Sequence, residues 1–369
     1  MGFSCGIVGL PNVGKSTLFN ALVSGEQARV ANFAFCTIDP NLGRVAVPDA
    51  RLSRLAEMSR SEKVTPATLE VVDIAGLVRG ASTGEGLGNR FLGQVREAGL
   101  ILHVLRCFGG EVSHTEGEVD PLRDAELVET ELMLADLESL ERQASGLEKR
   151  VRGGDEEAVL RMRVIDMARG ALEAGRAART AAAGESESAE VLGAWRGLNL
   201  LTAKDCVYVA NVGEGDVVSG NEYSEGVRSR AGECDFGFVM LSAAFESEVS
   251  CLGDADERRE FLGDAGLEAS GLERLVREGY GRLGLITFFT TGPKETRAWT
   301  VVGGVLAPGA AGCIHSDMER GFIRAETVSF ADFAECGGEA GARERGLLRH
   351  EGRDYVVCDG DVMNFRFNV

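Results

Sequence analysis

The sequence predicts an α/β protein with a mainly parallel sheet, a long helical insertion and a small separate α+β domain toward its C-terminal end. Three observations lead to this prediction. Short apolar runs alternate with helical patterns over the first 110 residues, a helical stretch without proline follows, and Thr, Phe and Val runs broken by glycine fill the last part of the chain. The length of 369 residues also exceeds one typical domain of about 150 residues.

The elements of the sheet come first along the chain. A strand is expected over residues 5–8, followed by a glycine-containing loop and a helix whose apolar residues begin at Leu18. Further short apolar runs predict strands over residues 44–47, 69–72 and 100–104. Strands that alternate with helical segments are typical of a mainly parallel sheet.

A helical insertion interrupts this alternation. Leucines at mostly three-, four- and seven-residue spacing predict a helix over about residues 123–150, and a second helical pattern covers about residues 156–183. The GGD sequence at 153–155 predicts a turn between them, and therefore an antiparallel coiled-coil hairpin within residues 122–198. Such a hairpin is either an inert insertion or a docking element, and both interpretations stay open.

The sheet pattern resumes after the insertion, with strands expected over residues 205–210 and 237–241 and a closing helix over residues 268–283. From Ile286 onward the pattern changes to that of a small α+β domain. We therefore expect one domain over residues 1–283, interrupted by the insertion, and a second domain over residues 284–367.

Composition excludes several classes of protein. The formal net charge of −19 argues against nonspecific coating of nucleic acid, and we expect no DNA partner. No apolar run approaches the roughly 20 residues of a membrane span, no signal-peptide pattern is present, and the cysteines form no C-x-x-C pair. We expect a cytoplasmic protein with reduced thiols, no membrane partner and no structural metal.

The loop after the first strand carries the most specific motif. The segment GLPNVGKSTL over residues 9–18 fits the pattern G-x-x-x-x-G-K-S/T. In such a loop, backbone N–H groups surround the phosphates, the lysine neutralises the β and γ phosphates, and the hydroxyl reaches Mg²⁺. The sequence therefore predicts a nucleoside triphosphate ligand. The expected binding residues in this loop are Asn12, Val13, Gly14, Lys15, Ser16 and Thr17.

Two further segments complete the expected phosphate and metal site. Asp73 begins a D-x-x-G pattern at the end of an apolar strand, where the carboxylate can reach the metal shell and the Gly76 N–H can face the γ-phosphate. Thr37 is the candidate for a second hydroxyl on the metal. We therefore expect Ser16, Thr37 and Asp73 to hold Mg²⁺.

A fourth segment bears on the choice of purine. GTP-specific proteins use N-K-x-D, whose Asp accepts two hydrogen bonds from guanine, whereas this chain has NVGE over residues 211–214. We expect Asn211 to pair with the N7 and amino edge of adenine, Val212 to form an apolar wall, and Glu214 to miss the guanine geometry. Ser242, at the end of a later strand, is expected to line the base. These residues favour ATP over GTP.

With these motifs in place, the whole chain resembles the YchF-type Obg-like ATPases, a branch of the translation-factor class of P-loop proteins. The segments that carry the resemblance are MGFSCGIVGLPNVGKSTLFNAL, DIAGLVRGASTGEGLGNRFL, NVGE, AWTVVGG, GFIRAE and DGDVMNFRFNV. The resemblance implies a P-loop nucleotidase domain, a coiled-coil insertion and a C-terminal TGS domain of the β-grasp type. It also implies ATP hydrolysis with Mg²⁺ and association with ribosomes.

Charge indicates which parts of the chain would meet ribosomal RNA. Residues 1–110 carry 11 basic and 9 acidic side chains, residues 285–369 carry 9 and 12, and the middle of the chain is strongly acidic. We therefore expect contacts with rRNA from the two ends, through side chains such as Arg320 and Arg324. The hairpin region, which we expect to hold most of the negative charge, would face ribosomal protein or solvent.

The catalytic residues are only partly indicated. Lys15 is expected to stabilise charge on the transferred phosphate, but Leu77 stands where Ras-like enzymes place the Gln that orients water. His114 is the candidate for that role, and its alternative is an ordinary surface position. Asn12 is expected either to hold K⁺ against the phosphates or to brace the loop.

The expected function is that of a cytoplasmic ATPase that acts as a nucleotide-dependent switch on the translation machinery. Two alternatives stay open. One is a GTPase of the Obg class, and the other is a module that senses ATP with negligible turnover.

Overall fold

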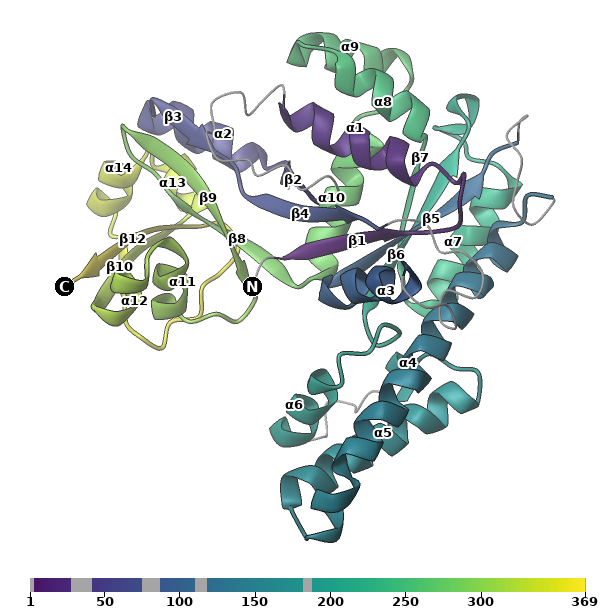
Figure 1. Ribbon diagram of the computed structural model, residues 1–369. Coiled ribbons are helices and arrows are strands. Elements are labelled where there is room, and N and C mark those ends of the chain that lie inside the picture. Colours follow the sequence, from purple (N-terminus) through teal and green to yellow (C-terminus); the bar gives the residue numbers. More distant parts are fainter. Residues whose placement is uncertain (1–2, 28–41, 75–86, 110–117, 182–187, 369) are drawn as a thin grey trace. The chain divides into compact units, whose positions relative to one another are not determined.

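The computed structural model describes residues 3–27, 42–74, 87–109, 118–181 and 188–368 (Figure 1). The chain forms two compact units. The first comprises Met1–Gly43 and Glu70–Leu275, and the second comprises Arg44–Leu69 and Val276–Val369. Within the described residues, no helix is long and apolar enough to cross a membrane.

The first unit is built on a sheet with the strand order β2-β4-β1-β5-β6-β7. Strand β1 lies at its centre, and its pairs with β4 and β5 are parallel, as are β5 with β6 and β6 with β7. The strands are β1 (Ser4–Val8), β2 (Leu42–Ala46), β4 (Thr68–Asp73), β5 (Leu100–Cys107), β6 (Asp205–Val212) and β7 (Gly237–Leu241). The predicted α/β class and the mainly parallel sheet are confirmed.

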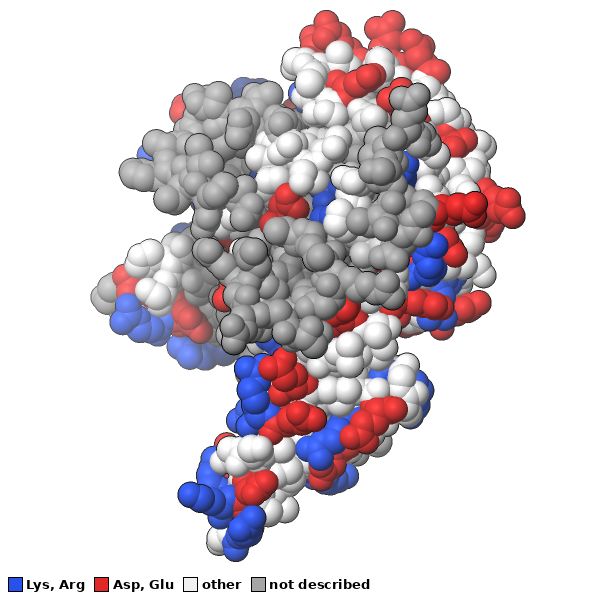
Figure 2. Space-filling model, turned by 45° about the vertical axis from the view of Figure 1, so that its right-hand side comes forward, with Lys and Arg blue, Asp and Glu red and all other residues white. Residues whose placement is uncertain are grey.

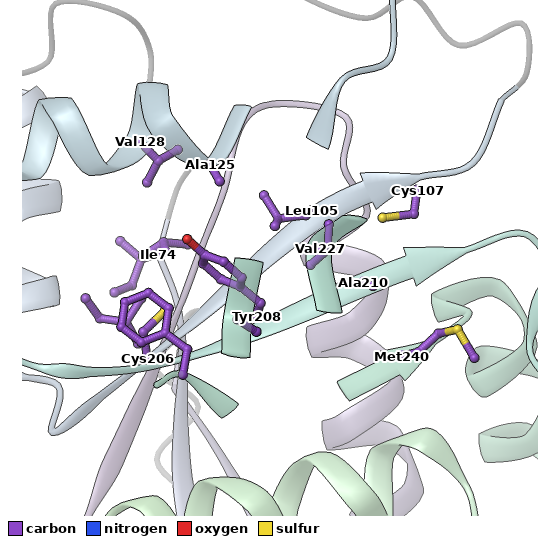
Figure 3. Packing of buried hydrophobic residues seen from close by; sticks show 14 of the residues in the cluster. Ile74, Leu105, Cys107, Ala125, Val128, Cys206, Tyr208, Ala210, Val227 and Met240 are labelled. Carbon is purple, nitrogen blue, oxygen red and sulfur yellow. The ribbon is translucent and has the colours of Figure 1, made fainter. Parts of the chain in front are cut away.

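Alternate residues of each strand serve the two faces of this sheet. On β6, Cys206, Tyr208, Ala210 and Val212 all belong to one buried apolar cluster, together with residues of helices α4 (Pro121–Arg152) and α7 (Glu222–Cys234) (Figure 3). Asn211 therefore belongs to the opposite face. The remaining helices of this unit are α1 (Lys15–Gln27), α3 (Leu87–Glu97), α7 (Glu222–Cys234), α8 (Ala243–Cys251) and α9 (Ala255–Asp264), and α10 (Gly271–Arg282) leads into the second unit.

The predicted hairpin consists of α4 (Pro121–Arg152) and α5 (Glu156–Glu173), which lie side by side (Figure 1). Its second helix ends about ten residues earlier than the sequence pattern suggests, because Gly175 has a φ of 69° and the chain turns there. A 3-10 turn (Ala178–Ala181) and α6 (Ala189–Gly197) complete the insertion. The hairpin has its own apolar core, which includes Leu140 and Ile165.

The second unit has a sheet with the strand order β11-β10-β12-β8-β9-β3. Its strands are β3 (Lys63–Thr65), β8 (Leu285–Thr290), β9 (Glu295–Val302), β10 (Phe322–Ser329), β11 (Arg349–Glu351) and β12 (Asp361–Phe367). Its helices are α2 (Ala50–Ser59), α11 (Ala307–Ile314), α12 (Ser316–Arg320), α13 (Phe330–Glu335) and α14 (Glu339–Glu344).

The second unit contains a segment that the sequence pattern assigns to the first. Strand β3 pairs in parallel with β9, and the Arg51 guanidinium at the start of α2 lies 2.6 Å from a carboxylate oxygen of Asp359. These contacts join residues 44–69 to the C-terminal part of the chain. No local pattern signals such a long-range pairing.

Candidate functional site

The loop between β1 and α1 has the backbone shape of a phosphate-binding loop. Gly9 and Gly14 have φ values of 153° and 97°, in the region that favours glycine, and Asn12 has a φ of 63°. A Cβ atom on Gly14 would lie 2.3 Å from the Asn211 amide nitrogen, so no larger residue fits there. Helix α1 begins directly afterwards at Lys15. The backbone N–H groups of its first turn, which have no partner within the helix, therefore point toward the loop.

Lys15 is held beneath this loop. Its ammonium donates a hydrogen bond of 2.6 Å to the Leu10 carbonyl oxygen, and the residue is only 7% exposed. Burial lowers the pKa of Lys15 to about 8, and the negative charge of Asp73 raises it in part. The side chain is thus fixed across the loop, where anionic phosphate oxygens would stabilise its charge.

Ser16 and Asp73 meet at the carboxyl end of the sheet. The Ser16 hydroxyl donates a hydrogen bond of 3.2 Å to Asp73 Oδ2, although the two residues are 57 positions apart. The other carboxylate oxygen, Asp73 Oδ1, is buried and has no hydrogen-bond partner among the residues that the structure describes. A hydroxyl beside a carboxylate with an unsatisfied oxygen suits a hard divalent cation such as Mg²⁺, which takes oxygen ligands.

Asn211 ties the loop to the far side of the sheet. Its amide nitrogen donates to the Val13 carbonyl oxygen at 2.8 Å, and its amide oxygen accepts from the Ala243 N–H at 2.9 Å. The residue is 3% exposed. Each amide group keeps one further bonding position, because the NH2 has two hydrogens and the oxygen two lone pairs, so the expected pairing of Asn211 with the purine edge stays a prediction. Asn211 braces the phosphate loop.

The other expected base contacts differ in accessibility. Val212 is 2% exposed and packs in the apolar cluster on the opposite face of β6, so it does not form the expected free apolar wall. Ser242 is also buried, and its hydroxyl caps α8 by accepting from the Phe245 N–H at 3.4 Å. Glu214 begins a short 3-10 turn and is exposed, so its carboxylate is accessible to a base.

The remaining expected site residues divide into two groups. Asn12, Ser16 and Thr17 are exposed along the loop and the first turn of α1. Thr37, Gly76, Leu77 and His114 lie outside the described residues.

One polar cluster at the amino end of the sheet has no signal in the sequence. Arg96, in the last turn of α3, donates to the carbonyl oxygens of Asn199 at 2.8 Å and Ala135 at 3.2 Å, and it lies 3.4 Å from Asp136 Oδ1. Asp136, on α4, is fully buried and accepts from the N–H groups of Leu201 and Thr202 at 2.9 and 2.8 Å and from the Thr202 hydroxyl at 2.8 Å. We call Arg96, Asp136 and Thr202 the hairpin latch.

The latch joins three distant segments. Helix α3 follows the D-x-x-G segment, α4 forms the first arm of the hairpin, and residues 199–202 return the chain to the sheet. Burial raises the pKa of the Asp136 carboxyl, while its hydrogen bonds and Arg96 limit that rise. Sequence spacing could not reveal the latch, because Arg96 and Asp136 are 40 residues apart and Thr202 lies 66 residues further on.

Comparisons with known proteins cover the whole chain. Proteins named "Ribosome-binding ATPase YchF" are 51% identical in Haemophilus influenzae, 50% in Escherichia coli O157:H7 and 46% in Bacillus subtilis, with 100% of both chains covered in each case. A solved structure, described as "Structure of the Schizosaccharomyces pombe YchF GTPase", is 35% identical, with a TM-score of 0.87 over 99% of this chain and 98% of that chain.

Two family models match separate parts of the chain. A model described as "50S ribosome-binding GTPase" matches residues 4–171. The YchF GTPase C-terminal model, described as a protein of unknown function, matches residues 285–368.

Proposed function

Because the chain belongs to the YchF family, we propose that it is a cytoplasmic Mg²⁺-dependent ATPase that binds ribosomes and acts as a nucleotide-dependent switch on the translation machinery. The observation that carries the proposal is the phosphate loop with Lys15 beneath it and the Ser16–Asp73 pair beside it. The names of the full-length relatives support the ribosome as partner.

The described residues account for binding and charge stabilisation. Lys15 would neutralise the β and γ phosphates, the N–H groups of the loop and α1 would hold their oxygens, and Ser16 and Asp73 would hold Mg²⁺. When bound, Mg²⁺ would withdraw negative charge from the phosphate oxygens. We retain Thr37 as a further metal ligand, Gly76 as a γ-phosphate contact and His114 as the residue that positions water.

Asn12 is the candidate residue for holding a monovalent cation. Its side chain is exposed on the loop and its backbone is held at a φ of 63°, a conformation that Asn tolerates. A K⁺ ion held by Asn12 would place positive charge against the phosphate oxygens, where negative charge develops during hydrolysis. Dependence of turnover on K⁺ rather than Na⁺ tests this proposal.

The Ser16–Asp73 pair predicts a defined effect on metal dependence. Replacing Asp73 by Asn removes one negative charge from the metal shell, so the Mg²⁺ concentration that half-saturates nucleotide binding should rise about tenfold. Without Mg²⁺, this variant should bind the nucleotide as tightly as the parent or more tightly, because a carboxylate no longer repels the phosphates.

Titration of a fluorescent nucleotide with and without Mg²⁺ measures both effects. Glu70→Gln removes a carboxylate from the same strand and is the matched control. Equal Mg²⁺ requirements for Asp73→Asn and the parent would exclude Asp73 from the metal site.

ATP is the proposed substrate, although some similar proteins are named ATPases and others GTPases. Curated relatives are named ATPases, whereas the solved fission-yeast structure and one family model carry the name GTPase. Of the four expected base contacts, Glu214 alone has an exposed side chain among the described residues. We therefore assign purine choice mainly to Glu214, whose carboxylate stands one methylene further from the backbone than the Asp that guanine requires.

Shortening this carboxylate should shift the preference toward GTP. In Glu214→Asp, hydrogen bonds to the two guanine donors become possible, and bonds to a charged acceptor contribute about 1.5 to 3 kcal/mol. The ratio of GTP to ATP affinity should therefore rise about tenfold or more. Val212 stays unchanged in this test, because a Lys there would enter the apolar cluster.

Competition of ATP and GTP for a labelled nucleotide provides the measurement. Glu222→Asp, the same change at another exposed glutamate, is the control. An unchanged ratio in Glu214→Asp would place purine choice elsewhere.

Two arginines expected to meet rRNA have partners in the second unit. Arg320 forms an ion pair with Asp317, and Arg324 lies 3.6 Å from Glu326, which also binds Arg366 at 3.0 Å. Arg324 and Arg366 are directly opposed on β10 and β12. We retain rRNA as a partner of this unit and add Arg366 to its proposed contact residues.

We propose that the hairpin latch carries the nucleotide signal. A nucleotide contact made by the segment after Asp73 would act on α3, and Arg96 at the end of α3 would transmit the change to the middle of α4. The rival proposal, a module that senses ATP with negligible turnover, predicts the same latch contacts but no stimulated hydrolysis.

A further inference from the structure

The hairpin core covers the apolar side chains of helix α5 only in part. The inner face of the helix, which includes Val164 and Ile165, is buried in the hairpin core. Met162 and Met167 pack against the edge of this core and, together with Val159, form a stripe that the core covers only in part. Val159 is 47% exposed, and the two methionines are only partly buried.

This stripe lines an open groove. The groove has a volume of about 580 Å³, and Val151 at the end of α4 contributes to its wall. Arg163 and Asp166 are its charged lining residues. The stretch from Val159 to Met167 spans about 12 Å along the helix, because each residue rises 1.5 Å. That length accommodates about two turns of a partner helix.

The end of the hairpin that holds the groove is basic. Residues 142–170 carry seven Lys and Arg side chains and five Asp and Glu side chains. Figure 2 shows basic, acidic and uncharged surface side by side along the hairpin, with basic side chains at its free end. Over the whole insertion, residues 122–198, 11 basic and 16 acidic side chains give a net charge of −5 out of −19 for the chain, so the expectation that the hairpin holds most of the negative charge is wrong. The basic residues are Arg142, Lys149, Arg150, Arg152, Arg161, Arg163 and Arg169.

We propose that this groove binds an amphipathic helix of a ribosomal protein, with apolar side chains that enter between Val151 and α5 and acidic side chains that face the basic hairpin end. The proposal rests on the proposed ribosome binding and names the part of the ribosome that the hairpin recognises. Methionine side chains suit this role because they are unbranched and adapt to the shape of a partner.

The lining favours a protein helix over RNA. Of the six lining side chains, only that of Arg163 offers a hydrogen-bond donor to phosphate, whereas Val151, Val159 and the two methionines offer apolar surface. The nearby arginines already bind carboxylates, as in Arg150 with Asp155 at 2.7 Å and with Glu157 at 3.0 Å. Exposed pairs of this kind are weak and hold the side chains in place. Apolar contact would therefore supply most of the binding, and the net positive charge would select an acidic partner.

The experiment compares two aspartate substitutions on the hairpin. Val159→Asp places a charge in the groove, and Leu134→Asp places the same charge on α4 outside it. The two parent side chains are equally exposed, at 47% and 45%, so both variants should fold, which circular dichroism and thermal melting verify. In sedimentation with purified ribosomes, Val159→Asp should lose about tenfold or more in affinity, whereas Leu134→Asp should stay within about twofold of the parent.

A photo-crosslinking amino acid in place of Met162 identifies what occupies the groove. The proposal requires a crosslink to a ribosomal protein, and a crosslink to rRNA alone would overturn it. Equal ribosome affinity of Val159→Asp and the parent would also overturn it while leaving ribosome binding intact. Failure of the parent protein itself to sediment with ribosomes would overturn both the groove and the proposed function.

Discussion

Replacement of Lys15 by Ala is expected to weaken triphosphate binding about a thousandfold. The buried ammonium lies under the phosphate loop, and its loss removes charge-assisted hydrogen bonds to the β and γ oxygens. Each such bond contributes about 1.5 to 3 kcal/mol, and two of them correspond to a factor of about 10² to 10⁴ in the dissociation constant. Titration with a fluorescent ATP analogue and Mg²⁺ gives this constant directly.

The chain offers a matched control for this substitution. Lys204 is a half-buried lysine of the first unit, and its ammonium donates to the Ala98 carbonyl oxygen at 2.6 Å, the same distance as in the hydrogen bond of the buried Lys15. It precedes β6 and so lies at the amino end of that strand, away from the loop. Lys204→Ala should bind the nucleotide like the parent. Similar losses in both variants would indicate general destabilisation, and no loss in Lys15→Ala would refute the site.

Replacement of Asp136 by Ala is expected to destabilise the first unit by about 3 to 5 kcal/mol, the range for the loss of one partner of a buried ion pair. The N–H groups of Leu201 and Thr202 and the guanidinium of Arg96 would all lose a buried acceptor. Nucleotide affinity should stay within about twofold of the parent, because no described contact joins Asp136 to the phosphate loop.

Urea unfolding followed by circular dichroism measures the stability change. Glu138→Ala is the control, since this carboxylate is exposed on the same helix and its pair with Arg142 is 3.9 Å long. Its cost should be below about 0.5 kcal/mol. Equal stabilities of the two variants would show that the latch does not hold the hairpin.

Most of the fold follows from local patterns in the sequence. The strand of residues 5–8, the loop and the start of α1 were predictable because motif and apolar spacing coincide there. The hairpin was predictable because its leucine spacing and its GGD turn agree. The early end of α5 was not, since the apolar pattern continues past Gly175 while the backbone turns.

Features that depend on distant contacts could not be predicted. The pairing of β3 with β9, the bridging role of Asn211 and the latch each join segments far apart in the chain. The assignment of Val212 to the base failed for a related reason. Alternation along β6 places neighbouring side chains on opposite faces, so Asn211 and Val212 cannot both face the phosphate loop.

The rate of phosphate release from ATP and from GTP, with and without purified ribosomes, tests the central claim most directly. Because Leu77 cannot orient water, hydrolysis by the protein alone should be slow. The account predicts that ribosomes raise the ATP rate about tenfold or more and that GTP remains the poorer substrate. A faster rate with GTP, or an ATP rate that ribosomes leave at its basal level, would contradict it.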